Sequence, residues 1–249
     1  MAARTSNWTR LRAWLEAQRP DVVCLQETKV EDALFPLEPL KALGYHVVFH
    51  GQRTYNGVAI LSRTEPTDVL RGGDLPGADP QARLLAATVE GVRVVNAYAP
   101  NGHAVGSEKF AYKLEWYRRL RALLDGSFDR QAPLVLCGDL NVAPEARDVY
   151  DPERFANDVL FHAEARAALA QVMDFGLVDG FRARRPEPGR YSWWDYRQLA
   201  FPKNRGARID HVLATPALAA RLTAAAIDRE LRKGKQPSDH APVIVEIAP

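Results

Sequence analysis

Short apolar runs separated by polar, glycine-containing turns recur along the chain. Each run is too short for a stable helix and rich in β-branched or large apolar residues, which is typical of buried strands. The predicted strands cover residues 22–25, 46–49, 58–61, 84–89, 92–97, 134–136, 209–213 and 243–247. Glycines between the earlier runs mark the turns.

Three longer segments have the apolar spacing of amphipathic helices, at residues 8–18, 107–124 and 163–175. Ser107 is expected to cap the second helix and Gly126 to stop it, and Gly176 is expected to stop the third. Strands joined in some places by helices and in others by turns favour an α/β protein of two packed sheets between outer helices. We expect one domain over residues 1–249.

Composition gives few constraints, because 47% hydrophobic and 26% charged residues are ordinary for a soluble protein. A net charge of +2 supports no global argument for nucleic-acid binding. One stretch differs, since eight Lys or Arg residues and two acids lie between Arg182 and Arg208. This stretch predicts either a solvated basic loop or a surface that contacts a phosphate backbone.

The two cysteines, Cys24 and Cys137, lie inside apolar runs, which predicts buried, reduced thiols. No apolar run approaches the ~20 residues of a membrane span, and no signal peptide is visible. We therefore expect a cytoplasmic protein that does not bind membranes. No coiled-coil pattern is present, so we expect a monomer.

Polar residues follow or precede several of the predicted strands. Asp139 and Asn141 come just after the run at 134–136, and alternation along a strand predicts that both point at one target. Asp239 and His240 precede the last run. A carboxylate, an amide and an imidazole that converge on one point suit the attack of water on a phosphate ester.

The residue types suggest a division of roles. Glu27, after the first strand, is the leading ligand for a hard divalent cation such as Mg²⁺. His240 suits proton transfer or phosphate stabilisation, with Asp210 as its orienting carboxylate. Asp139 is a candidate to activate water, but the sequence leaves open whether Asp139 or His240 is the base. Tyr98, at the end of the run at 92–97, could donate a hydrogen bond to the phosphoryl oxygens, as could Asn141.

Taken singly, each of these residues has a structural explanation as a cap, a surface group or a packing residue. The same chemistry at several strand ends favours a functional site. The chain has no phosphate-binding P-loop, no Gly-x-Ser-x-Gly nucleophile motif and no zinc-type cysteine or histidine spacing. A hard-metal site is therefore favoured.

At these residues the chain resembles the exonuclease III family of the endonuclease/exonuclease/phosphatase superfamily. The matching motifs are Leu-Gln-Glu-Thr-Lys (25–29), Tyr-Asn-Gly-Val-Ala-Ile-Leu-Ser (55–62), Asn-Ala-Tyr-Ala-Pro-Asn-Gly (96–102), Lys-Phe-Ala-Tyr-Lys-Leu (109–114), Gly-Asp-Leu-Asn-Val-Ala-Pro (138–144), Tyr-Ser-Trp-Trp-Asp-Tyr-Arg (191–197), Arg-Ile-Asp-His (208–211) and Ser-Asp-His-Ala-Pro (238–242). The Asp-x-Asn and Ser-Asp-His elements indicate only the superfamily. The Lys-Phe-Ala-Tyr-Lys and Ser-Trp-Trp-Asp-Tyr-Arg runs are more specific to the exonuclease III branch.

The resemblance implies a four-layer α/β sandwich of two mixed sheets flanked by helices, as in DNase I-like proteins. It implies cleavage of DNA phosphodiesters with Mg²⁺ or Mn²⁺. The implied partners are double-stranded DNA with abasic sites or 3′ ends. The implied activities are 3′→5′ exonuclease on duplex DNA, incision 5′ to an abasic site and cleaning of 3′ ends in base-excision repair.

The resemblance also implies the site. The implied catalytic residues are Tyr98, Asp139, Asn141, Asp210 and His240. The implied metal ligands are Glu27, Asp139, Asn141 and Asp239. The implied substrate-binding residues are Lys29, Asn101, Trp193, Trp194 and Arg197, with the two tryptophans at the wall near the abasic sugar. Core packing is the alternative interpretation of that aromatic pair.

The family normally opens with a strand that reads roughly Trp-Asn-Val-Asn-Ser, and this chain enters its first helix directly. Asn7 is not equivalent to the asparagine of that strand, because it lies next to the helix. Two hypotheses account for this departure, a start codon placed too late or a chain that is weakened or inactive. Loss of an interior strand removes hydrogen bonds and opens the core, so we expect lower stability than in a chain extended upstream.

Two further alternatives stay open on the sequence. One is a superfamily phosphatase that acts on phospholipids or inositol phosphates, against which the basic stretch and the Trp-Trp-Asp-Tyr-Arg run speak. The other is a catalytically inactive DNA-binding module, which the missing strand favours and the retained acidic residues oppose.

Overall fold

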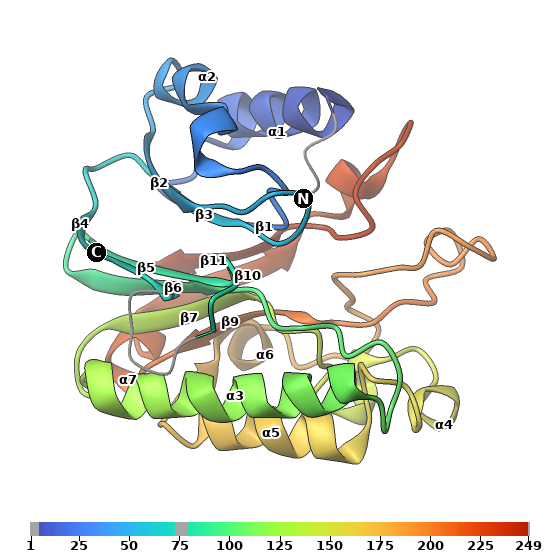
Figure 1. Ribbon diagram of the computed structural model, residues 1–249. Helices are drawn as coiled ribbons and strands as arrows, with labels where there is room; N and C mark the ends of the chain where they lie inside the picture. The colour runs from blue at the N-terminus through green and yellow to red at the C-terminus, as the bar shows by residue number, and fades with distance from the viewer. Residues whose placement is uncertain (1–4, 73–78, 249) are drawn as a thin grey trace.

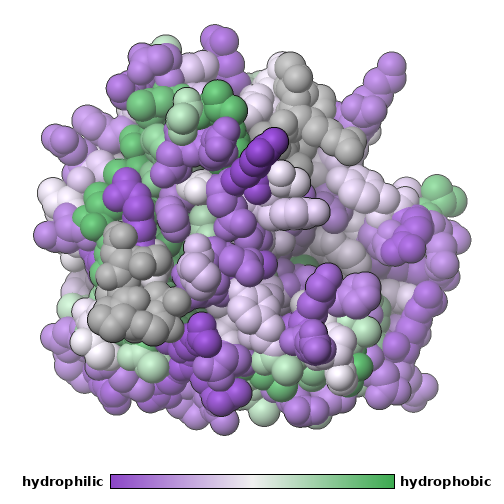
Figure 2. Space-filling view, viewed as in Figure 1, coloured by the Kyte–Doolittle hydropathy of each residue, from purple (hydrophilic) through white to green (hydrophobic). Residues whose placement is uncertain are grey.

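The computed structural model describes residues 5–72 and 79–248, with side chains from residue 8 onward. Two layers of sheet lie between two layers of helix (Figure 1). The helices α1 and α2 cover one side, and α3 and α5 run together along the other. The face seen in Figure 1 is mostly hydrophilic, with hydrophobic residues in small separate groups (Figure 2).

The larger sheet has six strands in the order β4-β5-β6-β7-β9-β8. Its strands are β4 (Thr67–Arg71), β5 (Leu84–Val89), β6 (Val92–Ala97), β7 (Leu134–Asp139), β8 (Val178–Asp179) and β9 (Asp210–Ala214). β6 and β7 are parallel and all other neighbours are antiparallel, so the sheet is mixed. The helix α3 connects the parallel pair, as a crossover connection requires.

The second sheet layer consists of two antiparallel pieces. One has the order β1-β3-β2, from β1 (Val22–Gln26), β2 (His46–His50) and β3 (Val58–Ser62). The other pairs β10 (Leu222–Ile227) with β11 (Val243–Ile247). The expectation of two mixed sheets is therefore corrected for this layer, in which every described pair is antiparallel.

β1 and β11 each have a single strand neighbour among the described residues. Both strands are apolar in sequence, yet most of their residues are only half-buried. Asn7 belongs to the helix α1 (Thr5–Gln18), and its side chain lies outside the part that the structure describes.

Three apolar clusters fill the spaces between the four layers. Along β3, Ala59 and Leu61 face α1 and α2, whereas Val58 and Ile60 face the larger sheet, as alternation in a strand requires. Trp116, Leu120 and Leu124 of α3 belong to the third cluster, with α5 and the other face of the larger sheet. All five residues of β3 are buried, which explains why it reads as a continuous apolar run.

The longer helices match the predicted segments, with differences at their ends. The helices are α1, α2 (Leu37–Lys41), α3 (Glu108–Ser127), α4 (Pro152–Phe155), α5 (Ala163–Met173), α6 (Gly180–Arg184) and α7 (Pro216–Ala219). Ser107 caps α3 as predicted, and its hydroxyl accepts from the Phe110 amide. The prediction that Gly126 stops α3 is wrong, because Gly126 lies within the helix. Among the described helices, none combines the length and apolarity needed to cross a membrane.

Candidate active site

The site is built first on the end of β7. Asp139 is the last residue of β7 and is buried, and Gly138 precedes it with φ +132°. A Cβ atom at Gly138 would lie 2.1 Å from the carbonyl oxygen of Ala97 on β6. Only glycine combines this φ with so close an approach. The Gly-Asp pair thus places the carboxylate at the edge where β6 and β7 both end.

Asn141 contacts Asp139, but not for the predicted reason. Asn141 lies beyond the strand, in the left-handed region with φ +51°, so strand alternation does not orient it. Its backbone amide donates to Asp139 Oδ1 at 2.9 Å, and its side-chain amide donates to Oδ2 at 3.1 Å. The side-chain amide also donates to the carbonyl of Ala99, at 3.0 Å. Both oxygens of Asp139 are therefore held by one residue.

His240 lies between two carboxylates. Asp210 begins β9 directly opposite Asp139 in the β7–β9 pairing. His240 Nδ1 lies 2.9 Å from Asp210 Oδ2, and Nε2 lies 3.8 Å from Asp139 Oδ2. Burial alone would lower the pKa of His240, but the charges of Asp210 and Asp139 raise it to about 10. The imidazole is thus a cation that Asp210 orients and that faces Asp139.

Glu27 approaches from the other sheet, directly after β1. The hydroxyl of Tyr98 donates to Glu27 Oε1, and Lys29 Nζ lies 3.0 Å from Oε2. Burial would raise the pKa of Glu27, but the bonds from Tyr98 and Lys29 hold it below its usual range. Burial and the charges of Glu27 and Asp139 raise the pKa of Tyr98, which stays a neutral donor. A carboxylate that follows β1 is thus hydrogen-bonded to a phenol that follows β6.

Three of the predicted site residues hold an uncommon backbone conformation. Glu27, Lys29 and Asn141 have φ of +55°, +53° and +51°. Left-handed backbone at a residue other than glycine costs of order 1–3 kcal/mol and is retained where the surroundings over-determine it. The loops after β1 and β7 therefore carry backbone strain at or next to the carboxylates of Glu27 and Asp139.

The two tryptophans of the Trp-Trp pair have different environments. Trp193 is half-buried, and its indole Nε1 donates to Asp239 Oδ2 at 3.1 Å. Trp194 is fully buried against Phe201 and donates to Asn204, so the prediction that Trp194 lines the substrate site is wrong. Alternation along this extended segment turns one ring to the site and the next to the core.

The remaining predicted substrate-binding residues lie at two places. Asn101 is exposed, and its amide donates to Asn141 Oδ1 at 3.2 Å, so it adjoins the Asp139 loop. Arg197 is exposed and pairs with Asp195, with 2.8 Å between Nη2 and Oδ2. Lys203 and Arg205 are exposed as well.

The stretch from Arg182 to Arg208 is not a continuous basic surface. Arg208 is fully buried and Arg182 almost so. Arg184 and Arg185 donate to the carbonyls of Leu222 and Ala225 on β10. The prediction of a phosphate-contact surface is therefore wrong for Arg182 and Arg208, which are neutralised inside the fold, and stays a prediction for the exposed basic residues.

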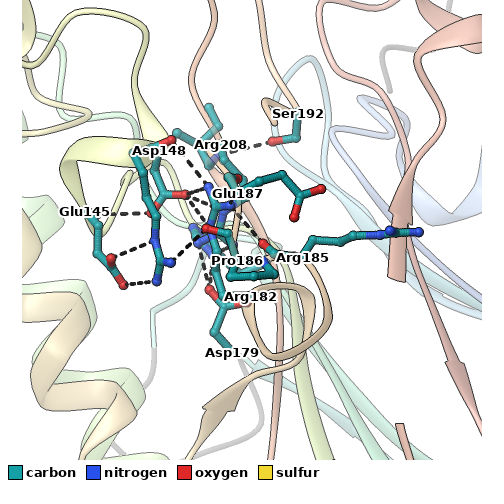
Figure 3. A network of polar contacts seen from close by, with 12 residues as sticks. Glu145, Asp148, Asp179, Arg182, Arg185, Pro186, Glu187, Ser192 and Arg208 are labelled. Carbon is teal, nitrogen blue, oxygen red and sulfur yellow. Dashed lines mark hydrogen bonds and ion pairs between the residues drawn. The ribbon is translucent and has the colours of Figure 1, made fainter. Parts of the chain in front are cut away.

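The buried arginines form a network with Asp148 and Asp179 (Figure 3). Arg208 Nε donates to Asp148 at 2.7 Å, and its Nη2 donates to Asp179 at 2.7 Å. Arg182 donates to the same oxygen of Asp148 through two nitrogens. Arg208 leads into β9, whose first residue is Asp210, so the network anchors the strand that carries the partner of His240.

His211 links this network to the Asp139 loop. Its Nδ1 lies 3.0 Å from Arg208 Nη1, and its Nε2 lies 2.8 Å from the carbonyl of Val142. Because arginine can only donate, Nδ1 accepts and Nε2 carries the proton that is donated to Val142. Burial and Arg208 lower the pKa of His211, which keeps this tautomer neutral.

Sequence reasoning missed several residues that shape the site. Ser192 Oγ accepts from the amides of Ile209 and Asp210, both at 3.1 Å. Lys113 is fully buried on α3, in line with the apolar residues Phe110 and Trp116. A lysine at a core position of an amphipathic helix is a signal that was available in the sequence.

Comparison with known proteins found similar sequences and structures over nearly the whole chain. The sequence model of the Endonuclease/Exonuclease/phosphatase family matches residues 2–240. The exodeoxyribonuclease III of Haemophilus influenzae is 37% identical over 249 residues, which cover 95% of this chain and 93% of that protein. An AP endonuclease from Archaeoglobus fulgidus has a TM-score of 0.92 and 42% identity, over 95% of this chain and 92% of that one.

A third relative is the 3′ phosphatase NExo from Neisseria, in a structure bound to a product DNA hairpin. It has a TM-score of 0.94 and 42% identity, over 98% of this chain and 95% of that one. The predicted fold class and the resemblance to exonuclease III proteins are confirmed by these similarities. The chain belongs to the Endonuclease/Exonuclease/phosphatase family.

Proposed function

We propose that this chain is a divalent-metal-dependent DNA phosphodiesterase of base-excision repair. Its activities are 3′→5′ exonuclease on duplex DNA, incision 5′ to abasic sites and cleaning of 3′ ends. The relatives named above are an exodeoxyribonuclease, an AP endonuclease and a 3′ phosphatase, which supports this proposal. The observation that carries it is the position of His240, held by Asp210 and facing Asp139.

The side chains present suit a hard divalent cation. Asp139, Asp210 and His240 offer possible ligand atoms within 4.8 Å of one another. However, both ring nitrogens of His240 face carboxylates, so a protonated imidazole is a poor ligand here. Carboxylate and amide oxygens suit Mg²⁺ or Mn²⁺ better, and the ligands that we propose from the family resemblance are Glu27, Asp139, Asn141 and Asp239. Bound there, such a cation supplies positive charge that stabilises the leaving oxygen of the phosphodiester.

The protein's own groups divide the remaining work. Asp139 is the water-activating group, because Asn141 orients both of its oxygens and burial raises its pKa to about 7 against the opposing charge of His240. His240 is cationic and stabilises the charge that grows on the phosphoryl oxygens. Tyr98 and Asn141 hold the two carboxylates in place, because the hydroxyl of Tyr98 donates to Glu27 and the side-chain amide of Asn141 donates to Asp139. We therefore propose Asp139, rather than His240, as the base.

The surroundings of the site suit a DNA strand. The exposed cations Arg197, Lys203 and Arg205 follow the Trp193 segment and provide phosphate contacts. Lys29 and Asn101 lie on the loops next to Glu27 and Asn141 and complete the substrate-binding set. We further propose that the chain acts as a monomer of one domain in the cytoplasm, where its free cysteines stay reduced.

Cleavage of a labelled duplex with one synthetic abasic site tests the proposal. The same reaction is run on a recessed 3′ end and on a 3′-phosphate, with Mg²⁺ and with a chelator. We expect metal-dependent cleavage by the native chain and its loss in Asp139→Asn. The matched control is Asp129→Asn, which removes an exposed carboxylate that accepts from the Gln131 amide.

Three outcomes would contradict the proposal in different ways. Cleavage that persists with chelator would exclude the metal-dependent mechanism. Salt-sensitive DNA binding without cleavage would identify an inactive binding module. Turnover of inositol phosphates in place of DNA would identify a phosphatase with another substrate.

A further inference from the structure

The helix α3 turns two polar side chains into the interior next to the site. Lys113 and Tyr117 are both buried, at 0% and 1% exposure, on the face that otherwise carries apolar residues. They are four positions apart, so they lie one helical turn apart on the same face. Neither residue belongs to the catalytic or metal-binding set proposed above.

Both side chains donate to the loop that carries the site. The hydroxyl of Tyr117 donates to the carbonyl of Leu140. The ammonium of Lys113 donates to the carbonyl of Asn141, at 2.8 Å. These two carbonyls are consecutive and directly follow β7, which ends at Asp139. One helix face therefore holds two adjacent peptide units, the one that joins Leu140 to Asn141 and the one that follows Asn141.

Lys113 extends this contact to two more segments. Its ammonium also donates to the carbonyl of Asn101, at 3.0 Å, and to that of Val159, at 2.7 Å. All three N–H groups of the ammonium are thus used, which is the full capacity of a lysine. The loop after β6, the loop after β7 and the segment before α5 meet at one nitrogen atom.

The loop has a physical need for such donors. Beyond the end of β7 its carbonyls have left the β ladder, and buried carbonyls must find donors elsewhere. Asn141 is also in left-handed backbone, which the surroundings have to maintain. Gly102 leaves space for the lysine stem, because a Cβ atom there would lie 3.0 Å from Lys113 Cδ.

A buried lysine is a costly way to fill this space. The side chain of Lys113 is fully buried, so its ammonium has lost its contact with water and depends on the protein for hydrogen bonds. A methionine would fill a similar volume without desolvating a charge. The cost indicates that the three hydrogen bonds, rather than the volume, are the reason for a lysine at this position.

We propose that Lys113 and Tyr117 are positioning residues that fix the backbone of residues 139–141 and so set the relative geometry of Asp139 and Asn141. The inference rests on the proposed function, since it names the reaction whose geometry they set. We call the pair the α3 clamp. It touches neither the substrate nor the metal and acts through the loop alone.

The test compares Tyr117→Phe, Lys113→Met and the double variant with the native chain. The matched control is Leu124→Ala, which removes a fully buried side chain from the same helix, farther along it from the site. Two quantities are measured, kcat and KM on the abasic duplex, and hydrogen exchange of the backbone amides of residues 138–143. The exchange measurement requires no activity and no added metal.

We expect kcat to fall by about 10- to 100-fold in the clamp variants, as for a misplacement of about 1 Å, with KM for the duplex unchanged. We expect faster exchange in residues 138–143 and an effect of the double variant smaller than the product of the single effects. Leu124→Ala should lower the melting temperature without either change.

Two results would overturn the inference. One is native kcat and native exchange in Tyr117→Phe, which keeps the ring and should fold even where Lys113→Met does not. The other is an equal loss of kcat in Leu124→Ala. That result would mean that the clamp variants lose activity because the protein is less stable, and not because the loop has moved. Absence of cleavage by the native chain would instead refute the proposed function, and the exchange measurement would still decide whether the clamp holds the loop.

Discussion

The side-chain amide of Asn96, on β6, donates to the carbonyl of Leu25, on β1, at 2.9 Å and so joins the two sheet layers beside Glu27. The same amide donates to the carbonyl of Ala59 on β3, at 2.9 Å. The side-chain oxygen of Asn96 accepts from Gln26 Nε2 at 2.7 Å. A single fully buried residue therefore holds three polar groups of the opposite sheet.

We predict that Asn96→Ala lowers the free energy of unfolding by about 2–4 kcal/mol, because a buried polar group left without a partner costs about 1–3 kcal/mol. Urea unfolding followed by circular dichroism measures this change. The control Asn157→Ala removes an exposed amide and should stay within about 0.5 kcal/mol of the native chain. Equal stability of the two variants would show that the inter-sheet bonds contribute nothing.

Asp148→Asn should destabilise the protein by about 3–5 kcal/mol at pH 7, because it leaves Arg182 and Arg208 buried beside a neutral group. Burial would raise the pKa of Asp148, but the two guanidinium groups hold it below its usual range. Its stabilising effect is therefore full above the unfolded-state pKa of about 4 and is lost as the pH falls through the folded-state value.

The difference in unfolding free energy between the native chain and Asp148→Asn should consequently narrow below about pH 4. Urea titrations at a series of pH values measure this difference. Asp129→Asn, at an exposed site, should follow the native chain throughout. A difference that stays constant from pH 7 to the acid limit would exclude the ion-pair explanation.

The neighbouring tryptophans should respond in opposite ways to replacement by phenylalanine. Trp193→Phe removes the donor to Asp239, and we predict a fall in kcat/KM of about 10- to 100-fold, as for the loss of a residue that orients a metal ligand, with little change in melting temperature. Trp194→Phe should lower stability by about 0.5–3 kcal/mol and leave kcat/KM nearly unchanged. A loss of stability in Trp193→Phe together with a loss of kcat/KM in Trp194→Phe would show that Trp194, and not Trp193, serves the site.

Glu27→Gln should weaken metal binding, because the amide keeps the shape of the side chain and removes its charge. Mg²⁺ that binds the folded state raises the melting temperature of the native chain by mass action, and we predict a smaller rise in the variant. Thermal unfolding over a Mg²⁺ titration measures both. Glu38→Gln, at an exposed ion pair with Lys41, is the control. An identical Mg²⁺ dependence in all three proteins would remove Glu27 from the metal site.

Much of the fold could be predicted because strands buried on both faces are apolar throughout, as β3 shows. The missed strand β10 has the sequence Leu-Thr-Ala-Ala-Ala-Ile, in which alanine favours helix over strand. Its pairing with β11 overrides that preference. β4 was missed because it is a short edge strand whose first three residues are exposed.

The candidate site, too, could be predicted only in part from the sequence. Residue types and spacing correctly brought Asp139 and Asn141 together, but the left-handed backbone that joins them is invisible to a pattern of alternation. Counting charges placed Arg208 on the surface, since no count reveals a buried partner such as Asp148 far away in sequence. Lys113 was passed over because a lysine in a helix is normally solvated.

The left-handed backbone at Glu27, Lys29 and Asn141 has a consequence for how the protein can be made heat-resistant. Lys29→Gly would relieve the local backbone strain, yet it would also let the loop beside Glu27 leave the conformation that the site requires. Stabilising changes at exposed helix positions, away from Lys113 and Tyr117, carry no such penalty. Heat-stabilising substitutions that preserve activity are therefore expected at exposed positions of the outer helices and not at these three loop positions.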